Sequence, residues 1–128
     1  MTKSDKILKA ISSLNETDKH LLLAEIYKRY KKSNPFEFIQ NIVCSHLKVS
    51  PVLLKSTSRK KKIVFARHLT MYLARMTTPF PLAIIGRNLG GRDHATVLFA
   101  CNKIAALAKE KEEVGVLIRT LIKEIKPA

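Results

Sequence analysis

Residues 81–104, PLAIIGRNLGGRDHATVLFACNKI, decide the fold that we predict for this chain. Pro81 suits the first turn of a helix, where its missing N–H leaves no hydrogen bond unmade. Apolar side chains then recur at helical spacing, at Leu82, Ile85 and Leu89. The glycine pair at 90–91 ends this helix, because glycine adopts positive φ without a steric penalty. We therefore predict a helix over about 81–89, followed by a tight turn.

A second helix is predicted directly after the glycine pair. Asp93 is a good N-cap residue, since its carboxylate can accept hydrogen bonds from the unpaired N–H groups of the next turn. The helix should extend to about Lys111, with these apolar residues along one face: Val97, Leu98, Cys101, Ile104 and Ala105. Two short helices joined by a glycine turn are typical of a helix-turn-helix.

The first turn of the second helix carries polar and small side chains. In a helix-turn-helix, this end of the recognition helix contacts base edges in the major groove. Arg92 can pair with phosphate or guanine, and Asp93 can accept from the cytosine amino group. His94 can donate or accept, Ala95 can contact a thymine methyl, and the Thr96 hydroxyl can bond phosphate or base. In the alternative interpretation, Asp93 only caps the helix and the other side chains are solvated surface.

The motif GGRDHATV at 90–97, followed by LFACNKI, resembles the DnaA family's C-terminal DNA-binding domain, from the bacterial chromosomal replication initiator. The run ARHLTMYLAR at 66–75 is similar to the long helix that precedes the helix-turn-helix in that family. The resemblance covers about Phe36 to Ile125 and leaves out residues 1–34. It implies an all-α fold: a compact helical domain with a helix-turn-helix of the Trp-repressor or DnaA C-terminal-domain type, which binds double-stranded DNA.

The segment KSTSRKKK at 55–62 is predicted to be a basic loop. A charge run of this kind indicates either a solvated loop or a contact with phosphate or with a minor groove. The resemblance places Arg59 at the minor groove, where arginine prefers narrow A/T-rich sequences. Lys60 and Lys61 are expected to position the DNA backbone.

A long amphipathic helix at 63–76 should follow the basic loop. Arg67 and Arg75 lie about two turns apart on it, so both can face one DNA backbone. The resemblance also implies phosphate contacts at these two positions. The residues expected to face inward are Ile63, Val64, Ala66, Leu69, Leu73 and Met76, with Met71 and Tyr72 nearer the flank.

The distribution of charge indicates a polyanionic partner. The net charge is +14, and no acidic residue lies between Glu37 and Asp93. Ten Lys and Arg residues fall within those 55 positions, so the excess charge forms one contiguous block. Nucleic acid or an anionic membrane surface would suit such a face. We expect double-stranded DNA at a DnaA-box-like site, and no membrane partner.

Two structural units are expected. Residues 1–34 would form a helical hairpin, from helices at about 3–14 and 17–31, which completes the core or supports self-association. Residues 35–128 would form the DNA-binding domain, with further helices at 35–47, 51–54 and 112–126.

Other features limit the range of functions. No G-x-x-x-x-G-K-[ST] loop occurs, so the chain is not expected to bind ATP. Cys44 and Cys101 lack zinc-type spacing and should be core thiols of a cytoplasmic, nucleoid-associated protein. We predict no cofactor, no metal site and no enzymatic activity.

Two other functions stay open. The same basic face could bind DNA of any sequence or RNA, although few aromatic residues are available for base stacking. A nuclease would use His68, His94 or Asp93, but the interval without carboxylates disfavours a paired-metal site. Two departures from the family concern specificity: Ala95 stands where many members have Thr, and Ala83 where a proline is common.

Overall fold

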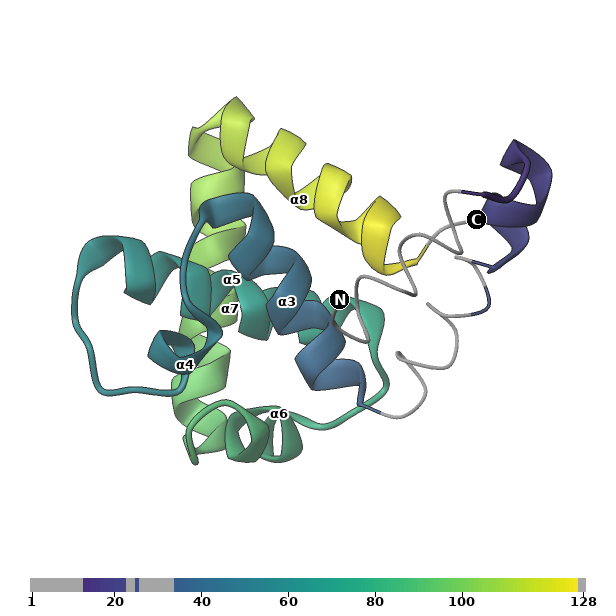
Figure 1. Ribbon diagram of the computed structural model, residues 1–128. Coiled ribbons are helices and arrows are strands. Elements are labelled where there is room, and N and C mark those ends of the chain that lie inside the picture. The colour runs from purple at the N-terminus through teal and green to yellow at the C-terminus, as the bar shows by residue number, and fades with distance from the viewer. Residues whose placement is uncertain (1–12, 23–24, 26–33, 127–128) are drawn as a thin grey trace. The chain divides into compact units, whose positions relative to one another are not determined.

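The computed structural model describes residues 13–22, 25 and 34–126 (Figure 1). The chain divides into two compact units, Met1–Asn34 and Pro35–Ala128. In the first unit, residues 16–22 are helical. The Asn15 Oδ1 accepts from the Asp18 backbone N–H at 2.8 Å just where this helix begins. Of the predicted helix at 3–14 only residues 13 and 14 are described, and these form a turn. Much of the helix predicted at 17–31 and the predicted self-association lie outside the described residues.

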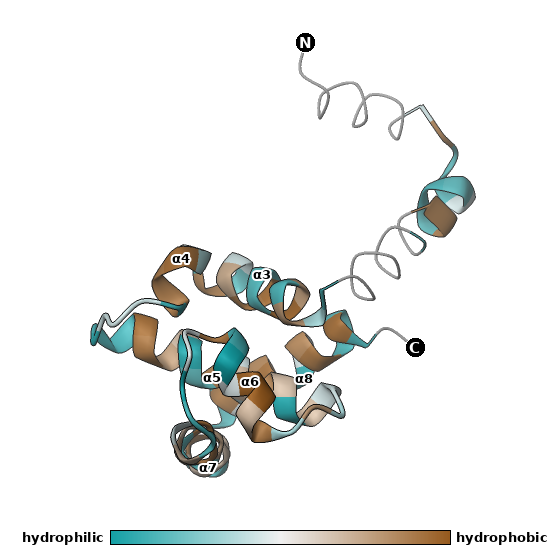
Figure 2. Ribbon diagram, turned by 90° about the horizontal axis from the view of Figure 1, so that it is seen from below, coloured by the Kyte–Doolittle hydropathy of each residue, from teal (hydrophilic) through white to brown (hydrophobic). Residues whose placement is uncertain are grey.

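The described part of the second unit consists of helices joined by turns and loops and has no strand, which confirms the predicted all-α fold. Its helices are α3 (Pro35–Leu47), α4 (Pro51–Leu54), α5 (Lys61–Thr77), α6 (Leu82–Asn88), α7 (His94–Glu110) and α8 (Glu112–Ile125). Their bounds agree with the predicted ranges to within two residues. Figure 2 shows both apolar and polar segments on these helices, as expected when one face of each packs on a core.

The central helix is α5, which packs against α3, α4, α6, α7 and α8. Because it has neighbours on several sides, its buried surface extends beyond one stripe. Met71 is fully buried and Met76 is 54% exposed, so the predicted orientation of these two side chains is wrong. The Thr70 hydroxyl, also buried, donates to the Ala66 carbonyl at 2.8 Å and so stays satisfied without water.

Helix α8 packs on α3, α5 and α7. Its buried face is Val114, Ile118, Leu121 and Ile125, an i, i+4, i+7, i+11 pattern. Val116 lies off this face and is 47% exposed. On the surface, the His46 ring Nε2 lies 2.8 Å from Glu124 Oε1 and links α3 to α8. Cys44 and Cys101 are buried free thiols, as predicted.

Helix α7 links the two ends of this unit. Figure 1 shows it running from α6 at one end to α8 at the other, with its first turn beside α6. Its buried residues are Val97, Ala100, Cys101 and Ile104. The side chain of Leu98, which was predicted to face the core, is 39% exposed. The face of α7 opposite the buried residues therefore does not pack in the core.

Candidate nucleic-acid interface

The turn between α6 and α7 depends on three glycines. Gly90 and Gly91 have φ values of 86° and 69°, as predicted for a turn that ends a helix. Gly86, which the sequence analysis did not single out, lies where α6 meets the turn. Its carbonyl accepts from the Arg92 backbone N–H at 2.8 Å. A Cβ on Gly86 would overlap the Arg92 carbonyl oxygen and lie 3.0 Å from the Val97 side chain.

Asp93 caps α7, as predicted. Its Oδ1 accepts from the Thr96 backbone N–H at 2.8 Å. This bond and a further one from the Thr96 side chain hold the pKa of the Asp93 carboxyl below its usual range. Asp93, His94, Ala95 and Thr96 are all exposed, so the first turn of α7 presents its side chains to solvent.

The basic loop at 55–60 has hydrogen bonds of its own. The Ser56 hydroxyl donates to the Leu53 carbonyl at 2.6 Å, and the Ser58 backbone N–H donates to the Ser56 hydroxyl oxygen at 3.2 Å. Lys60 is the N-cap residue of α5, without a side-chain capping bond. These short-range bonds fold the loop back on the end of α4.

Arg67 lies beneath this loop. Its guanidinium donates through Nε to the carbonyl of Leu54, the last residue of α4, at 2.8 Å. Through Nη2 it donates to the loop carbonyls of Ser56 at 2.9 Å and Ser58 at 3.0 Å. The side chain is 7% exposed. The prediction that Arg67 faces the DNA backbone beside Arg75 is therefore corrected, because its hydrogen bonds to the carbonyls of Leu54, Ser56 and Ser58 hold the guanidinium inward. Burial, and secondarily the charge of Arg92, lowers the pKa of Arg67.

Arg92 was predicted to contact phosphate or guanine, and this prediction is also corrected, because its guanidinium is turned toward backbone carbonyls of the protein. Its Nη1 donates to the Leu89 carbonyl at 2.5 Å and its Nη2 to the Ser56 carbonyl at 2.7 Å. Burial lowers the pKa of this guanidinium. The Ser56 oxygen thus accepts from both Arg67 and Arg92. Through these two arginines the basic loop is joined to α5 and to the turn before α7.

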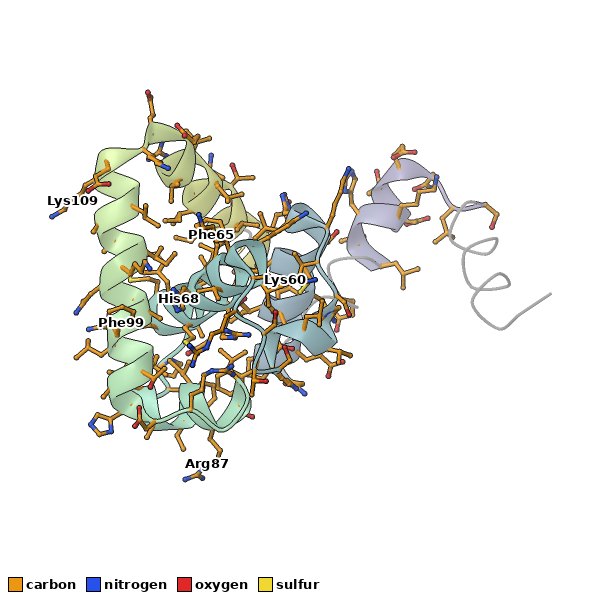
Figure 3. All side chains as sticks on the ribbon, turned by 90° about the vertical axis from the view of Figure 1, so that its left-hand side faces the viewer. Lys60, Phe65, His68, Arg87, Phe99 and Lys109 are labelled. Carbon is orange, nitrogen blue, oxygen red and sulfur yellow. The ribbon has the colours of Figure 1, made fainter. Side chains whose placement is uncertain are left out.

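The other predicted cations are exposed. Arg59, Lys60 and Lys61 lie on the loop and the first turn of α5, and Arg75 lies in the last turn of that helix. Figure 3 shows Lys60 in the part of the chain where the loop meets α5. Since Arg92 ties the loop to the α6–α7 turn, the exposed end of α7 and these loop cations belong to neighbouring parts of one surface.

A further cluster joins α5 to α7 and was missed by the sequence analysis. The rings of His68 and Phe99 meet edge to face, with centroids 6.1 Å apart (Figure 3). The Lys103 Nζ lies 5.9 Å from the centroid of the same Phe99 ring. Burial, followed by the charges of Lys103, Arg67 and Arg92, lowers the pKa of His68. The sequence did contain one sign of this cluster: Phe99 lies one helical turn after Ala95, on the face of the predicted helix that carries the first-turn side chains.

Neither a metal site nor a membrane-spanning helix is evident in the described ranges. No three His, Cys, Asp or Glu side chains gather there as a possible metal site. No helix among those residues has both the length and the apolar character needed to cross a bilayer.

Comparisons with known proteins give one consistent result. The sequence model of the bacterial DnaA helix-turn-helix matches residues 36–104. The chromosomal replication initiator protein DnaA of Thermus thermophilus is 42% identical over 100 residues, which are 77% of this chain and 23% of the relative. DnaA of Streptococcus thermophilus is 41% identical over 92 residues, 72% of this chain and 20% of the relative.

A third relative extends the similarity. DnaA of Lachnoclostridium phytofermentans is 34% identical over 124 residues, 92% of this chain and 27% of the relative. Residues 35–128 alone are too few to make up that share, so this alignment extends into residues 1–34. The chain spans about a quarter of the length of the curated relatives it matches. The match over 36–104, together with the geometry of α6, the glycine turn and α7, shows that the chain belongs to the bacterial DnaA helix-turn-helix family.

Proposed function

We propose that this chain binds double-stranded DNA in a sequence-specific way, at a site similar to a DnaA box. The observation that carries the proposal is the exposed first turn of α7, from Asp93 to Thr96, which is joined through Arg92 to a basic loop. A recognition-helix end beside a cationic loop is suited to contact a major groove and the adjacent minor groove together.

The first turn of α7 supplies the major-groove contacts. The Asp93 carboxylate can accept from a cytosine amino group while it caps the helix, because a carboxylate has about four acceptor sites. His94 can donate or accept at a base edge, and the Ala95 methyl can contact a thymine methyl. The Thr96 hydroxyl can bond phosphate or base.

The basic loop and α5 supply the remaining contacts. Arg59 would enter the minor groove, and Lys60, Lys61 and Arg75 would contact phosphates, which fix orientation without specifying sequence. Arg67 and Arg92 have another role in this proposal. They hold the loop against the recognition unit, so that the two DNA-contacting parts keep a fixed spacing.

The name of the relatives, chromosomal replication initiator protein, supports a proposal for the cellular role. We propose that this chain acts in the initiation of replication or in its regulation, by occupying initiator sites on the bacterial chromosome in the cytoplasm. DNA binding by this unit needs no ATP, cofactor or metal, since every contact named above comes from its own side chains.

Two variants separate sequence recognition from charge. Binding would be measured by fluorescence anisotropy on a duplex with the family's A/T-rich nonamer box and on a scrambled duplex. His94→Ala should lose about 1–3 kcal/mol on the box and little on the scrambled duplex, since base contacts carry the sequence preference. Lys61→Ala should weaken binding to both duplexes and reduce the salt slope by about one phosphate contact.

Lys109→Ala is the matched control for charge. It removes the same charge as Lys61→Ala, but Lys109 lies in the last turn of α7 (Figure 3). A rise of about 1.5 Å per residue puts it about 22 Å along the helix from His94. Little change is expected on either duplex. If His94→Ala and Lys61→Ala lost affinity equally on both duplexes, the second candidate function would stand: DNA or RNA binding of any sequence through the same basic face.

A further inference from the structure

Phe99 is a large apolar side chain on the exposed face of α7. It is 62% exposed, although a phenylalanine ring gains most by burial. The buried residues of α7 are Val97, Ala100, Cys101 and Ile104, which puts Phe99 on the opposite face of the helix. The fold therefore gives this ring no core to pack in, and its exposure needs another explanation.

Neighbouring side chains hold the ring in one orientation. His68 of α5 meets it edge to face at 6.1 Å between centroids, and the Lys103 ammonium lies 5.9 Å from its centroid. Figure 3 shows His68 of α5 beside Phe99 of α7. A ring fixed by two partners loses little further freedom on binding, which favours a specific contact over a loose one.

The position of Phe99 links it to the proposed recognition turn. Ala95 and Phe99 are four residues apart, so their side chains lie one above the other on the outer face of α7, about 6 Å apart along the helix. A major groove is about 12 Å wide and 8.5 Å deep, and some recognition helices contact bases over two turns. A helix that enters the groove at residue 94 can therefore bring residue 99 to the next base pairs.

The chemistry of the ring limits what it can recognise there. Phenylalanine has no hydrogen-bonding group, and the apolar group that a major groove offers is the C5 methyl of thymine. We propose that Phe99 contacts a thymine methyl beyond the bases reached by the first turn and so adds specificity for an A·T pair. This inference rests on the proposed function, because it assumes that α7 enters a major groove.

The test removes one methyl group at a time from the DNA. Each thymine of the nonamer-box duplex and its flanks is replaced singly by deoxyuridine, which keeps every hydrogen bond. The native chain and Phe99→Ala are titrated against each duplex by anisotropy. At one position, deoxyuridine should weaken the binding of the native chain by about fourfold, which corresponds to the burial of one methyl group. At that position Phe99→Ala should show the loss already on thymine and no further loss on deoxyuridine.

Two controls keep the outcome specific. Leu98→Ala removes another exposed apolar side chain of α7 that lies off the row of Ala95 and Phe99, and it should stay sensitive to the same deoxyuridine. Any thymine methyl touched by Ala95 should matter equally to the native chain and to Phe99→Ala. Because Phe99 is exposed, its replacement should leave the thermal unfolding temperature nearly unchanged.

Three results would overturn the inference. If the native chain prefers the box but every deoxyuridine effect is the same in Phe99→Ala, only this inference fails and the proposed function stands. If Phe99→Ala weakens binding to single-stranded oligothymidine more than binding to the duplex, the ring stacks on unpaired bases instead. If the native chain does not prefer the box at all, the proposed function fails and the methyl contact fails with it.

Discussion

The two non-helical segments of the candidate interface are held in opposite ways. The turn between α6 and α7 is fixed by the absence of side chains, at Gly86, Gly90 and Gly91. The basic loop at 55–60 is fixed by long side chains that come from elsewhere, Arg67 of α5 and Arg92 of the turn itself. Glycines set one segment locally, whereas arginines from distant positions set the other.

This difference shows how one basic sequence can contain two kinds of cation. Arg67 and Arg92 bond backbone carbonyls and serve the fold, while Arg59, Lys60 and Lys61 are exposed. Arginine suits the first task because its planar fork of donors can bond several carbonyls at once. Net charge alone therefore overstates how many cations are available to a polyanion.

The largest effect is expected where the turn has no room. Gly86→Ala would place a methyl group on the Arg92 carbonyl, a backbone atom that cannot move without opening the turn. We expect a loss of about 3 kcal/mol or more in the free energy of unfolding, measured with guanidinium chloride. Gly115→Ala, in α8, is the matched control, since its nearest neighbour would be the flexible Arg119 side chain at 3.4 Å. It should gain up to about 1 kcal/mol. Equal effects at both glycines would mean that the α6–α7 contact does not fix the turn.

The loop should respond next most strongly. Arg67→Met keeps the bulk of the side chain but leaves the carbonyls of Leu54, Ser56 and Ser58 without this donor. A loss of about 2–3 kcal/mol is expected, because the Leu54 and Ser58 carbonyls lose this donor at about 1–3 kcal/mol for each group left unpaired and buried, whereas the Ser56 carbonyl keeps its bond from Arg92. Limited trypsin digestion should then cut faster after residues 59–62. Arg87→Met, at an exposed arginine of α6, should change neither quantity. If trypsin cut the loop of Arg67→Met no faster than that of the native chain, the proposed role of the Arg67 guanidinium would be contradicted.

A smaller effect distinguishes backbone strain from steric overlap at the two glycines of the turn, Gly90 and Gly91. Gly91→Ala adds a Cβ in open space, so only its positive φ of 69° opposes it, for about 1–2 kcal/mol. Gly90→Ala also has positive φ, and in addition its Cβ would lie 2.8 Å from the Lys55 carbonyl oxygen. Thermal unfolding should rank Gly90→Ala as the more destabilised of the two. If Gly91→Ala were the more destabilised, the Lys55 carbonyl of the basic loop would have to move away from the new Cβ at residue 90 at little cost.

The smallest effect concerns the cap of α7. Hydrogen bonds from Thr96 lower the pKa of Asp93 in the folded state. Stability from this carboxylate is therefore present above the unfolded-state pKa of about 4 and is lost as pH falls through the lower folded pKa. Asp93→Asn keeps a capping oxygen but does not titrate. In thermal melts between pH 6 and 2.5, the native chain should lose its advantage over Asp93→Asn only below about pH 4. A constant difference across that range would show that the charge does not matter.

The sequence predicted what depends on near neighbours. Helix bounds, the glycine turn and the Asp93 cap all follow from residues within a few positions of one another. It failed where distant segments decide. The same pattern that marks Arg67 as a surface cation also fits a buried one, because the carbonyls that hold it lie 9 to 13 residues away, at the end of α4 and in the loop that follows. The exposure of Phe99 and its contact with His68 likewise need the packing of α5 on α7.

The central claim is that the exposed turn of α7 and the loop beside it recognise a DNA sequence together. The most direct test is the affinity of the native chain for a nonamer-box duplex against a scrambled duplex of equal length, at several salt concentrations. We predict at least tenfold tighter binding to the box, about 1.4 kcal/mol, at each salt concentration. Equal affinity for the two duplexes with a steep salt dependence would contradict the claim and leave only a basic face that binds phosphate.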